Sequence, residues 1–270
     1  MPEPAALYQT IDGGVSWRLI ADDGNDIYAI KAYSPIDTGI TGRYHTGMVF
    51  ESPTDGWMAI SSLDDGGGTL LHTIDGGHTW HPVTMMSAST TVTPITVTAL
   101  VNCELFDLRL EAPGVLTLGA YCLDDNLVKT GFLYQTTNDG VTWQVNSLPA
   151  NFINNYGAFQ LYMMSATDGL AVGCDSPARV PDPKDCATVT PLPLAFYRTT
   201  DSGQTWTRSG PLPDVLRPAV SNASNATYAQ FDFIDDHTGW AIDPTGKLLI
   251  TVDGGKIWTP LNVKIENVGT

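Results

Sequence analysis

The sequence predicts an all-β fold, a β-propeller of four-stranded antiparallel blades. A short motif with an acidic or amide residue, a glycine and a tryptophan recurs five times along the 270 residues. A short apolar segment precedes each copy, and four copies have a second glycine turn further upstream. A four-stranded unit that repeats at intervals of tens of residues is typical of a propeller blade. About five blades are therefore expected, the first of them incomplete.

The recurring motif reads T-x-D-x-G-x-T-W and predicts a tight turn between two antiparallel strands. Its third residue can accept hydrogen bonds from backbone N–H groups of the same turn. Its glycine supplies a positive φ, and its tryptophan is expected to enter the layer between neighbouring sheets. Asn138 and Ile257 depart from the pattern and are expected to weaken two turns. The third-position residues are Asp12, Asp75, Asn138, Asp201 and Asp253, and the tryptophans are Trp17, Trp80, Trp143, Trp206 and Trp258.

The upstream turns supply two further strands to each unit. Apolar residues stand six and eight positions before Gly56, Gly114, Gly169 and Gly239, which is the period-two spacing of one strand face. The sequence predicts one domain over residues 1–270, with a half-blade at 5–20 and blades at about 46–85, 104–147, 158–209 and 228–263. Residues 26–33 could add a strand to the half-blade. Alternatively, the chain is cut from a longer propeller.

These motifs resemble the Asp box, the repeat of bacterial neuraminidases (BNR repeat). The whole unit is similar to the propeller repeat of photosystem II assembly factors, sortilin ectodomains and xyloglucan-active glycosidases. The resemblance covers residues 7 to 263 and implies a propeller of the sialidase-like superfamily. It also implies that the boxes are structural and lie away from the binding face. Since many functions share this fold, it implies no particular activity.

The four cysteines predict two disulfides. If Ala112 and Pro113 form the tip of a hairpin, Cys103 and Cys122 face each other across antiparallel strands, within disulfide range. The other two, Cys174 and Cys186, bracket a proline-rich loop. Two disulfides indicate an extracytoplasmic protein, either secreted or at the cell surface, whereas four buried thiols would not. The first residues have neither the basic nor the apolar region of a signal segment.

Composition limits the partners. The formal net charge is −16, with 13 Lys+Arg against 29 Asp+Glu, which opposes binding to nucleic acid and to anionic membranes. No apolar run reaches the roughly 18–20 residues of a membrane span, so no membrane insertion is expected. A protein or glycan ligand is expected, and the oligomeric state is left open.

The variable loops predict where a ligand binds. Connections from strand 2 to strand 3, and from strand 4 to the next strand 1, vary most in length and share the face opposite the boxes. Tyrosines near the mouth of this face could form an aromatic platform for sugar or peptide, or simply pack under their own loops. The candidate binding residues are Arg43, Tyr44, His45, Tyr156, Tyr228, Asp64 and Asp124.

The sequence does not show the set of catalytic residues that a sialidase or a glycoside hydrolase needs. A sialidase needs three converging arginines, and only Arg43, Arg179 and Arg217 fall in loops of that face. A glycoside hydrolase needs two carboxylates facing each other across a cleft, which nothing in the sequence shows. No cofactor or metal ligand is assigned, although the acidic stretches 22–26 and 64–68 leave calcium open. The sequence favours a non-catalytic binding scaffold, with a glycoside hydrolase and a structural fragment of a larger surface protein as alternatives.

Overall fold

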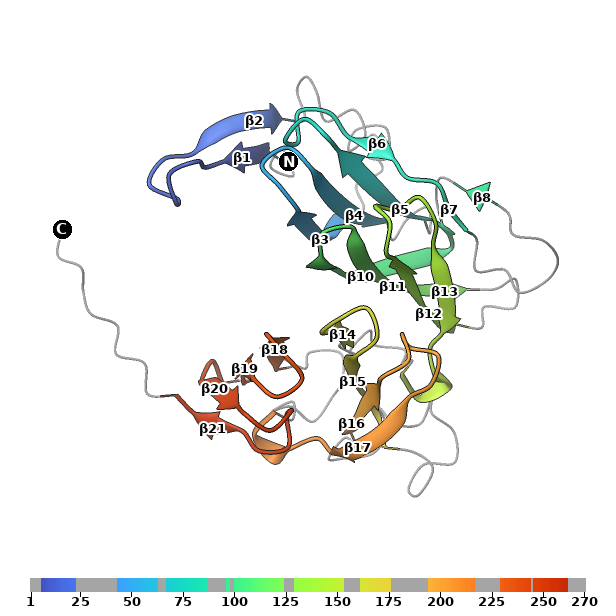
Figure 1. Cartoon of the computed structure of the whole chain (residues 1–270), viewed down its shortest axis with the longest axis vertical. Helices are drawn as coiled ribbons and strands as arrows, with labels where there is room; N and C mark the ends of the chain where they lie inside the picture. The colour runs from blue at the N-terminus through green and yellow to red at the C-terminus, as the bar shows by residue number, and fades with distance from the viewer. Residues whose placement is uncertain are drawn as a thin grey trace. The chain divides into compact units, whose positions relative to one another are not determined.

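The computed structural model describes residues 6–22, 43–62, 67–86, 96–97, 100–123, 129–152, 161–175, 194–216, 229–243 and 245–261. Strands and turns make up nearly all of them, with two short 3-10 helices, η1 (Ala150–Phe152) and η3 (Asp214–Leu216). Four antiparallel sheets of four consecutive strands follow a two-stranded sheet, which confirms the all-β propeller fold (Figure 1). No helix in these ranges has the length and apolar character of a membrane span. The chain divides into two compact units, Met1–Asn146 and Ser147–Thr270.

The first unit holds one isolated hairpin and two blades. The first hairpin pairs β1 (Ala6–Gln9) with β2 (Arg18–Asp22). Blade I contains β3 (Arg43–Phe50), β4 (Gly56–Ser62), β5 (Gly67–Thr73) and β6 (His81–Pro82), and β9 (Leu100–Val101) adds to β5. A small sheet pairs β7 (Met85–Met86) with β8 (Thr96–Val97). Blade II contains β10 (Cys103–Ala112), β11 (Val115–Leu123), β12 (Lys129–Thr136) and β13 (Gln144–Ser147).

The second unit holds two blades. Blade III contains β14 (Leu161–Met163), β15 (Gly169–Cys174), β16 (Leu194–Thr199) and β17 (Thr207–Pro211). Blade IV contains β18 (Gln230–Phe233), β19 (Gly239–Ile242), β20 (Leu248–Thr251) and β21 (Thr259–Pro260). In both blades each strand pairs with the strand that follows it, so the sequence order is also the order in the sheet.

The glycine that opens strand 2 is required by close packing. In blade IV, a Cβ on Gly239 would lie 2.6 Å from the ring of Phe233, and in blade I a Cβ on Gly56 would lie 2.6 Å from the ring of Phe50. Both rings also pack edge-on against the motif tryptophan of their own blade, at 5.9–6.0 Å between centroids. The glycine therefore lets a strand-1 aromatic side chain reach the tryptophan across the sheet.

Blade II differs from the other three blades in where its glycine lies. Gly114 lies in the turn, at φ 73°, as expected for a glycine between the two predicted strands, and β11 begins at Val115. The residue that faces the motif threonine Thr136 is Leu116. The other three blades place glycine at this point, opposite Thr73, Thr199 and Thr251. In blade II the glycine therefore stands two residues before the position that faces the motif threonine.

The first predicted disulfide is present. Cys103 lies opposite Cys122 in the β10–β11 ladder, and the two form a disulfide with 4.0 Å between their Cα atoms. The assumed hairpin tip was wrong, because Ala112 pairs with Val115 and the turn is Pro113–Gly114. Two register shifts between this tip and Phe106 restore the expected pairing at the cysteines. Cys174 is also disulfide-bonded, and its predicted partner, residue 186, lies outside the described residues.

Candidate functional site

The motif turns are closed by their own side chains. In blade I, Asp75 Oδ1 accepts the N–H of Thr79 at 2.8 Å, and its Oδ2 accepts the Thr79 hydroxyl at 2.6 Å. Thr73 Oγ1 donates to Asp75 Oδ1 at 2.8 Å and accepts the N–H of Gly77 at 2.9 Å. The same bonds recur around Asp12 and Asp201. Sequence reasoning assigned the carboxylate and the glycine correctly but missed the role of the first threonine.

The two departing motifs behave differently. Asn138 Oδ1 accepts the N–H of Thr142 at 2.9 Å, and its Nδ2 donates to the Thr142 hydroxyl at 2.9 Å, so that turn keeps its bonds without a charge. Ile257 has no hydroxyl, and Asp253 Oδ1 accepts the N–H groups of Lys256 and Ile257 at 3.0 and 2.9 Å instead. Only the isoleucine removes a hydrogen bond from its turn.

Burial and hydrogen bonding act in opposite directions on the motif carboxylates. Burial raises the pKa of Asp75, but the bonds from the Thr79 hydroxyl and N–H outweigh it and bring the pKa to about 2. Hydrogen bonds from Ser16 bring the pKa of Asp12 to about 2 as well. A carboxylate with a lowered folded-state pKa stabilises the fold fully above its unfolded pKa, and this contribution is lost as the pH falls through the folded value.

We expect acid to destabilise the fold between pH 4 and pH 2, the interval that these pKa values set. The substitution Asp75→Asn, which introduces the amide that Asn138 carries in blade II, removes one titrating group and should flatten the decline. The substitution Asp75→Ala removes the acceptor and should cost about 1 kcal/mol at pH 7. Urea unfolding followed by tryptophan fluorescence at pH 2, 3, 4 and 7 measures both effects. An unchanged pH dependence in Asp75→Asn would contradict the role of this carboxylate.

In each complete blade, the motif turn is tied to the turn between strands 1 and 2. The fourth motif residue has a positive φ, as at Gly76 and Ser202. Its N–H donates to a carbonyl of the other turn: Gly76 to Thr54 at 2.8 Å, Ser202 to Thr167 at 2.9 Å and Gly254 to His237 at 2.8 Å. We call this end of each blade the turn end. Backbone N–H groups at the turn end therefore donate hydrogen bonds to carbonyls of the same blade.

The opposite end of each blade, the loop end, is where the candidate binding residues were expected, and three of them can be located there. Arg43, Tyr44 and His45 open β3 and lie opposite Ser62, Ser61 and Ile60, the last residues of β4. They were expected just before strand 1, and the strand in fact begins at Arg43. The other candidates, Tyr156, Tyr228, Asp64 and Asp124, lie outside the described residues. A binding role for all seven residues stays a prediction.

Three arginines on the strands form local ion pairs. Arg208 makes a bidentate pair with Asp175 at 2.6 and 2.8 Å. Arg109 Nε lies 2.9 Å from Asp107 in the same strand. Arg198 lies 3.8 Å from Asp168 and 3.5 Å from Asp236, and so joins the turn ends of blades III and IV.

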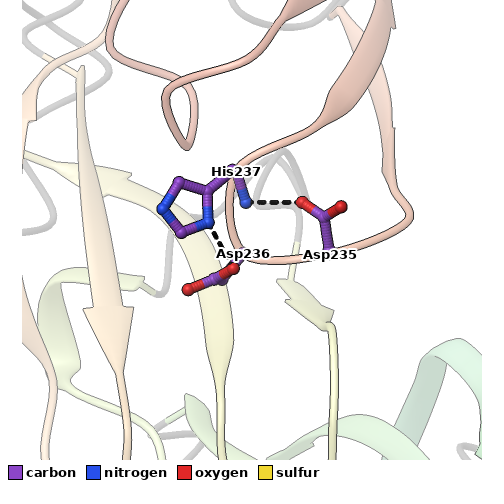
Figure 2. A group of neighbouring side chains, drawn as sticks. All are labelled: Asp235, Asp236 and His237. Atoms are coloured by element: carbon purple, nitrogen blue, oxygen red, sulfur yellow. Dashed lines mark hydrogen bonds and ion pairs between the residues drawn. The ribbon is translucent and has the colours of Figure 1, made fainter.

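One exposed turn gathers potential metal ligands. The carboxylates of Asp235 and Asp236 and the imidazole of His237 place ligand atoms within 4.8 Å of one another (Figure 2). However, Asp235 Oδ1 accepts the N–H groups of His237 and Thr238 at 2.8 and 2.6 Å, and these bonds, that of Thr238 first, lower its pKa. Asp236 bonds to the His237 ring and to Arg198. The carboxylates therefore already serve to shape the turn.

The fold defines the class of the molecule as a β-propeller of four-stranded antiparallel blades. No family model matches the sequence, and no curated protein matches it. Solved structures do match. A protein of unknown function from Dyadobacter fermentans is 13% identical over 94% of this chain and 81% of its own, with a TM-score of 0.45.

Two further solved structures carry descriptive names. YCF48 bound to a D1 peptide is 14% identical over 80% of each chain, with a TM-score of 0.37. A GH74 enzyme from Niastella koreensis is 12% identical over 95% of this chain and 44% of its own, with a TM-score of 0.28. At these TM-scores the likenesses assign neither an activity nor a ligand to the chain.

Proposed function

We propose that this chain is a non-catalytic, extracytoplasmic binding scaffold, an Asp-box (BNR-repeat) propeller that recognises a protein or a glycan through its loop end. The observation that carries the proposal is the contrast between the two ends of the blades. At the turn end, carboxylates and N–H groups bond to one another within the turns. The longest connections follow β2, β15 and β17, and the strands that they link end and begin at the loop end. We expect ligand recognition at the loop end, because loops there can vary in sequence without breaking these hydrogen bonds.

The disulfide supports the extracytoplasmic part of the proposal. The Cys103–Cys122 bond joins adjacent strands of blade II, and Cys174 in blade III is disulfide-bonded as well. Disulfides of this kind persist in oxidising compartments and are rare where thiols are kept reduced. The acidic charge of −16 favours a neutral or basic ligand.

Binding and turnover can be measured on the same protein. We expect the full chain to bind members of a glycan array or an immobilised peptide library without consuming them. Because one aromatic side chain in a binding site commonly contributes more than 1 kcal/mol, Tyr44→Ala should weaken binding on the order of tenfold. Asp236→Ala, an exposed substitution at the turn end, is the matched control and should leave binding unchanged.

The hydrolase alternative predicts a different outcome. If the loop end holds paired catalytic carboxylates, the chain will release product from a glycoside substrate, and Asp64→Ala or Asp124→Ala will abolish that release. Such a result would overturn the scaffold proposal. Binding that survives Tyr44→Ala but is lost in Asp236→Ala would place recognition at the turn end instead.

A further inference from the structure

Three neighbouring strands of blade I bring a tryptophan and two histidines into one row. Trp57 of β4 lies opposite His72 of β5, and His72 lies opposite His81 of β6. Residues directly opposite in an antiparallel ladder point to the same face of the sheet, with Cβ atoms about 4.5–5.5 Å apart. The two histidine side chains therefore leave neighbouring strands on the same face, within reach of each other.

The ring of His72 is held in place by two contacts. It stacks on Trp57, with 4.0 Å between the ring centroids and 15° between the planes. Its Nε2 lies 3.0 Å from Oδ1 of Asp55, in the turn between strands 1 and 2. The backbone closes that turn, because the N–H groups of Glu51 and Ser52 donate to the Asp55 carbonyl at 3.0 and 3.3 Å. The carboxylate of Asp55 therefore orients His72 while the backbone shapes the turn.

The same two positions carry other side chains in other repeats. In the first hairpin they are Gln9 and Arg18, and Arg18 Nη2 donates to Gln9 Oε1 at 3.2 Å. Side chains at this pair of positions therefore do reach each other across the two strands. In blade III the equivalent residues are Arg198 and Thr207. Of these three pairs, that of blade I alone offers two imidazole nitrogens.

We propose that His72, His81 and Asp55 form a binding site for a zinc ion. Imidazole nitrogens and carboxylate oxygens are common zinc ligands. Two ligands of a tetrahedral zinc ion, with bonds of about 2.0–2.1 Å, lie about 3.3 Å apart. The 3.0 Å between His72 Nε2 and Asp55 Oδ1 is close to that spacing.

His81 supplies the third ligand. In this structure its ring nitrogens do not lie within 4.8 Å of both other groups. Its side chain is exposed, however, and completes the set by turning about its own bonds. The side chains of His72 and Asp55 are 26% and 38% exposed, so an ion reaches them from solvent. Water takes the fourth position.

The bound ion joins β5, β6 and the turn before β4. Strand β6 is only two residues long, so a metal bond to His81 anchors the outer edge of blade I. Zinc should therefore raise the thermal unfolding midpoint of the chain, because a ligand that binds the folded state stabilises it. Coordination requires neutral imidazoles, so zinc affinity should fall as the pH is lowered.

Calorimetric titration of the full chain, without an affinity tag, with zinc chloride tests this site. Wild-type protein should bind one ion here. His81→Gln removes a ligand and should weaken binding by at least roughly tenfold, the least that losing even an outer partner of a metal site usually costs. Asp55→Asn should weaken it by at least roughly the same factor. His78→Gln removes an exposed histidine from the adjacent motif turn and is the matched control, which should bind zinc as wild type does.

The variants also distinguish this site from other places where zinc could bind. Wild-type protein that binds no zinc up to about 1 mM would overturn the proposal. Binding that His81→Gln leaves unchanged would overturn it as well. So would binding that is lost in His237→Gln, because the ion would then lie at the turn of Asp235 and Asp236. Thermal unfolding without zinc confirms that each variant is folded, and zinc should no longer raise the midpoint of His81→Gln.

Discussion

Replacing Trp258 with alanine is expected to cost about 3–5 kcal/mol of unfolding free energy, the usual range for removing a buried large aromatic side chain. Trp258 is 8% exposed, and its ring packs edge-on against Phe233 with 5.9 Å between centroids. Its Nε1–H donates to the carbonyl of Gly255 at 3.0 Å. The substitution would leave a cavity in the core of the second unit and a carbonyl without its donor.

The neighbouring Ile257 supplies the control for this experiment. Its side chain is 68% exposed, so Ile257→Ala should change stability by no more than about 0.5 kcal/mol. Urea unfolding followed by circular dichroism measures both variants, and Trp258→Phe should lie between them because it keeps part of the ring packing. Equal losses in Trp258→Ala and Ile257→Ala would show that the motif tryptophan does not support the blade.

Removing the Cys103–Cys122 disulfide is expected to have the second large effect on unfolding stability. The double substitution of Cys103 and Cys122 by serine should lower stability by about 2–4 kcal/mol, because the open chain gains freedom in the unfolded state. The bond closes a segment with a sequence separation of 19 and includes a buried cysteine. The denaturation midpoint under oxidising conditions measures the loss.

Reduction distinguishes the two disulfide-bonded sites. Dithiothreitol should lower the midpoint of wild-type protein by more than that of the double variant. The response that remains in the variant then reports on the bond of Cys174, in the other unit. A double variant as stable as the oxidised wild type would mean that the β10–β11 ladder holds its register without the covalent bond.

Much of the fold could be predicted because its signals are local. A turn that needs a positive φ and a side-chain oxygen acceptor leaves those residue types at fixed spacing, and all five turns follow it, four with a carboxylate and one with the Asn138 amide. The antiparallel pairing of Cys103 with Cys122 was predicted from a hairpin, although the tip lies one residue further along and two register shifts restore the pairing. Both inferences depend on residues that are close together in the sequence.

Other features depend on interactions that spacing does not encode. Gly114 lies in the turn as expected, yet Leu116 rather than a glycine faces the motif threonine Thr136. The β10–β11 pairing is also irregular around Asp107, whose φ is 54°. Trp17 has the same motif context as Trp80, but one is exposed and the other buried, because burial is set by the neighbouring sheet. Arg43, Tyr44 and His45 could be placed near the start of a strand, but convergence of loops from different blades has no local signature.

The strand order of the blades also shapes how the chain can fold. The four main strands of each of blades I to IV pair in sequence order, and the described turns between strands 1 and 2 and between strands 3 and 4 form hydrogen bonds with one another. Such hairpins form on the microsecond scale, and repeat structures can nucleate at more than one place. Folding can therefore begin at several turns at once, including during synthesis, and each blade needs only the residues already made to complete its own sheet.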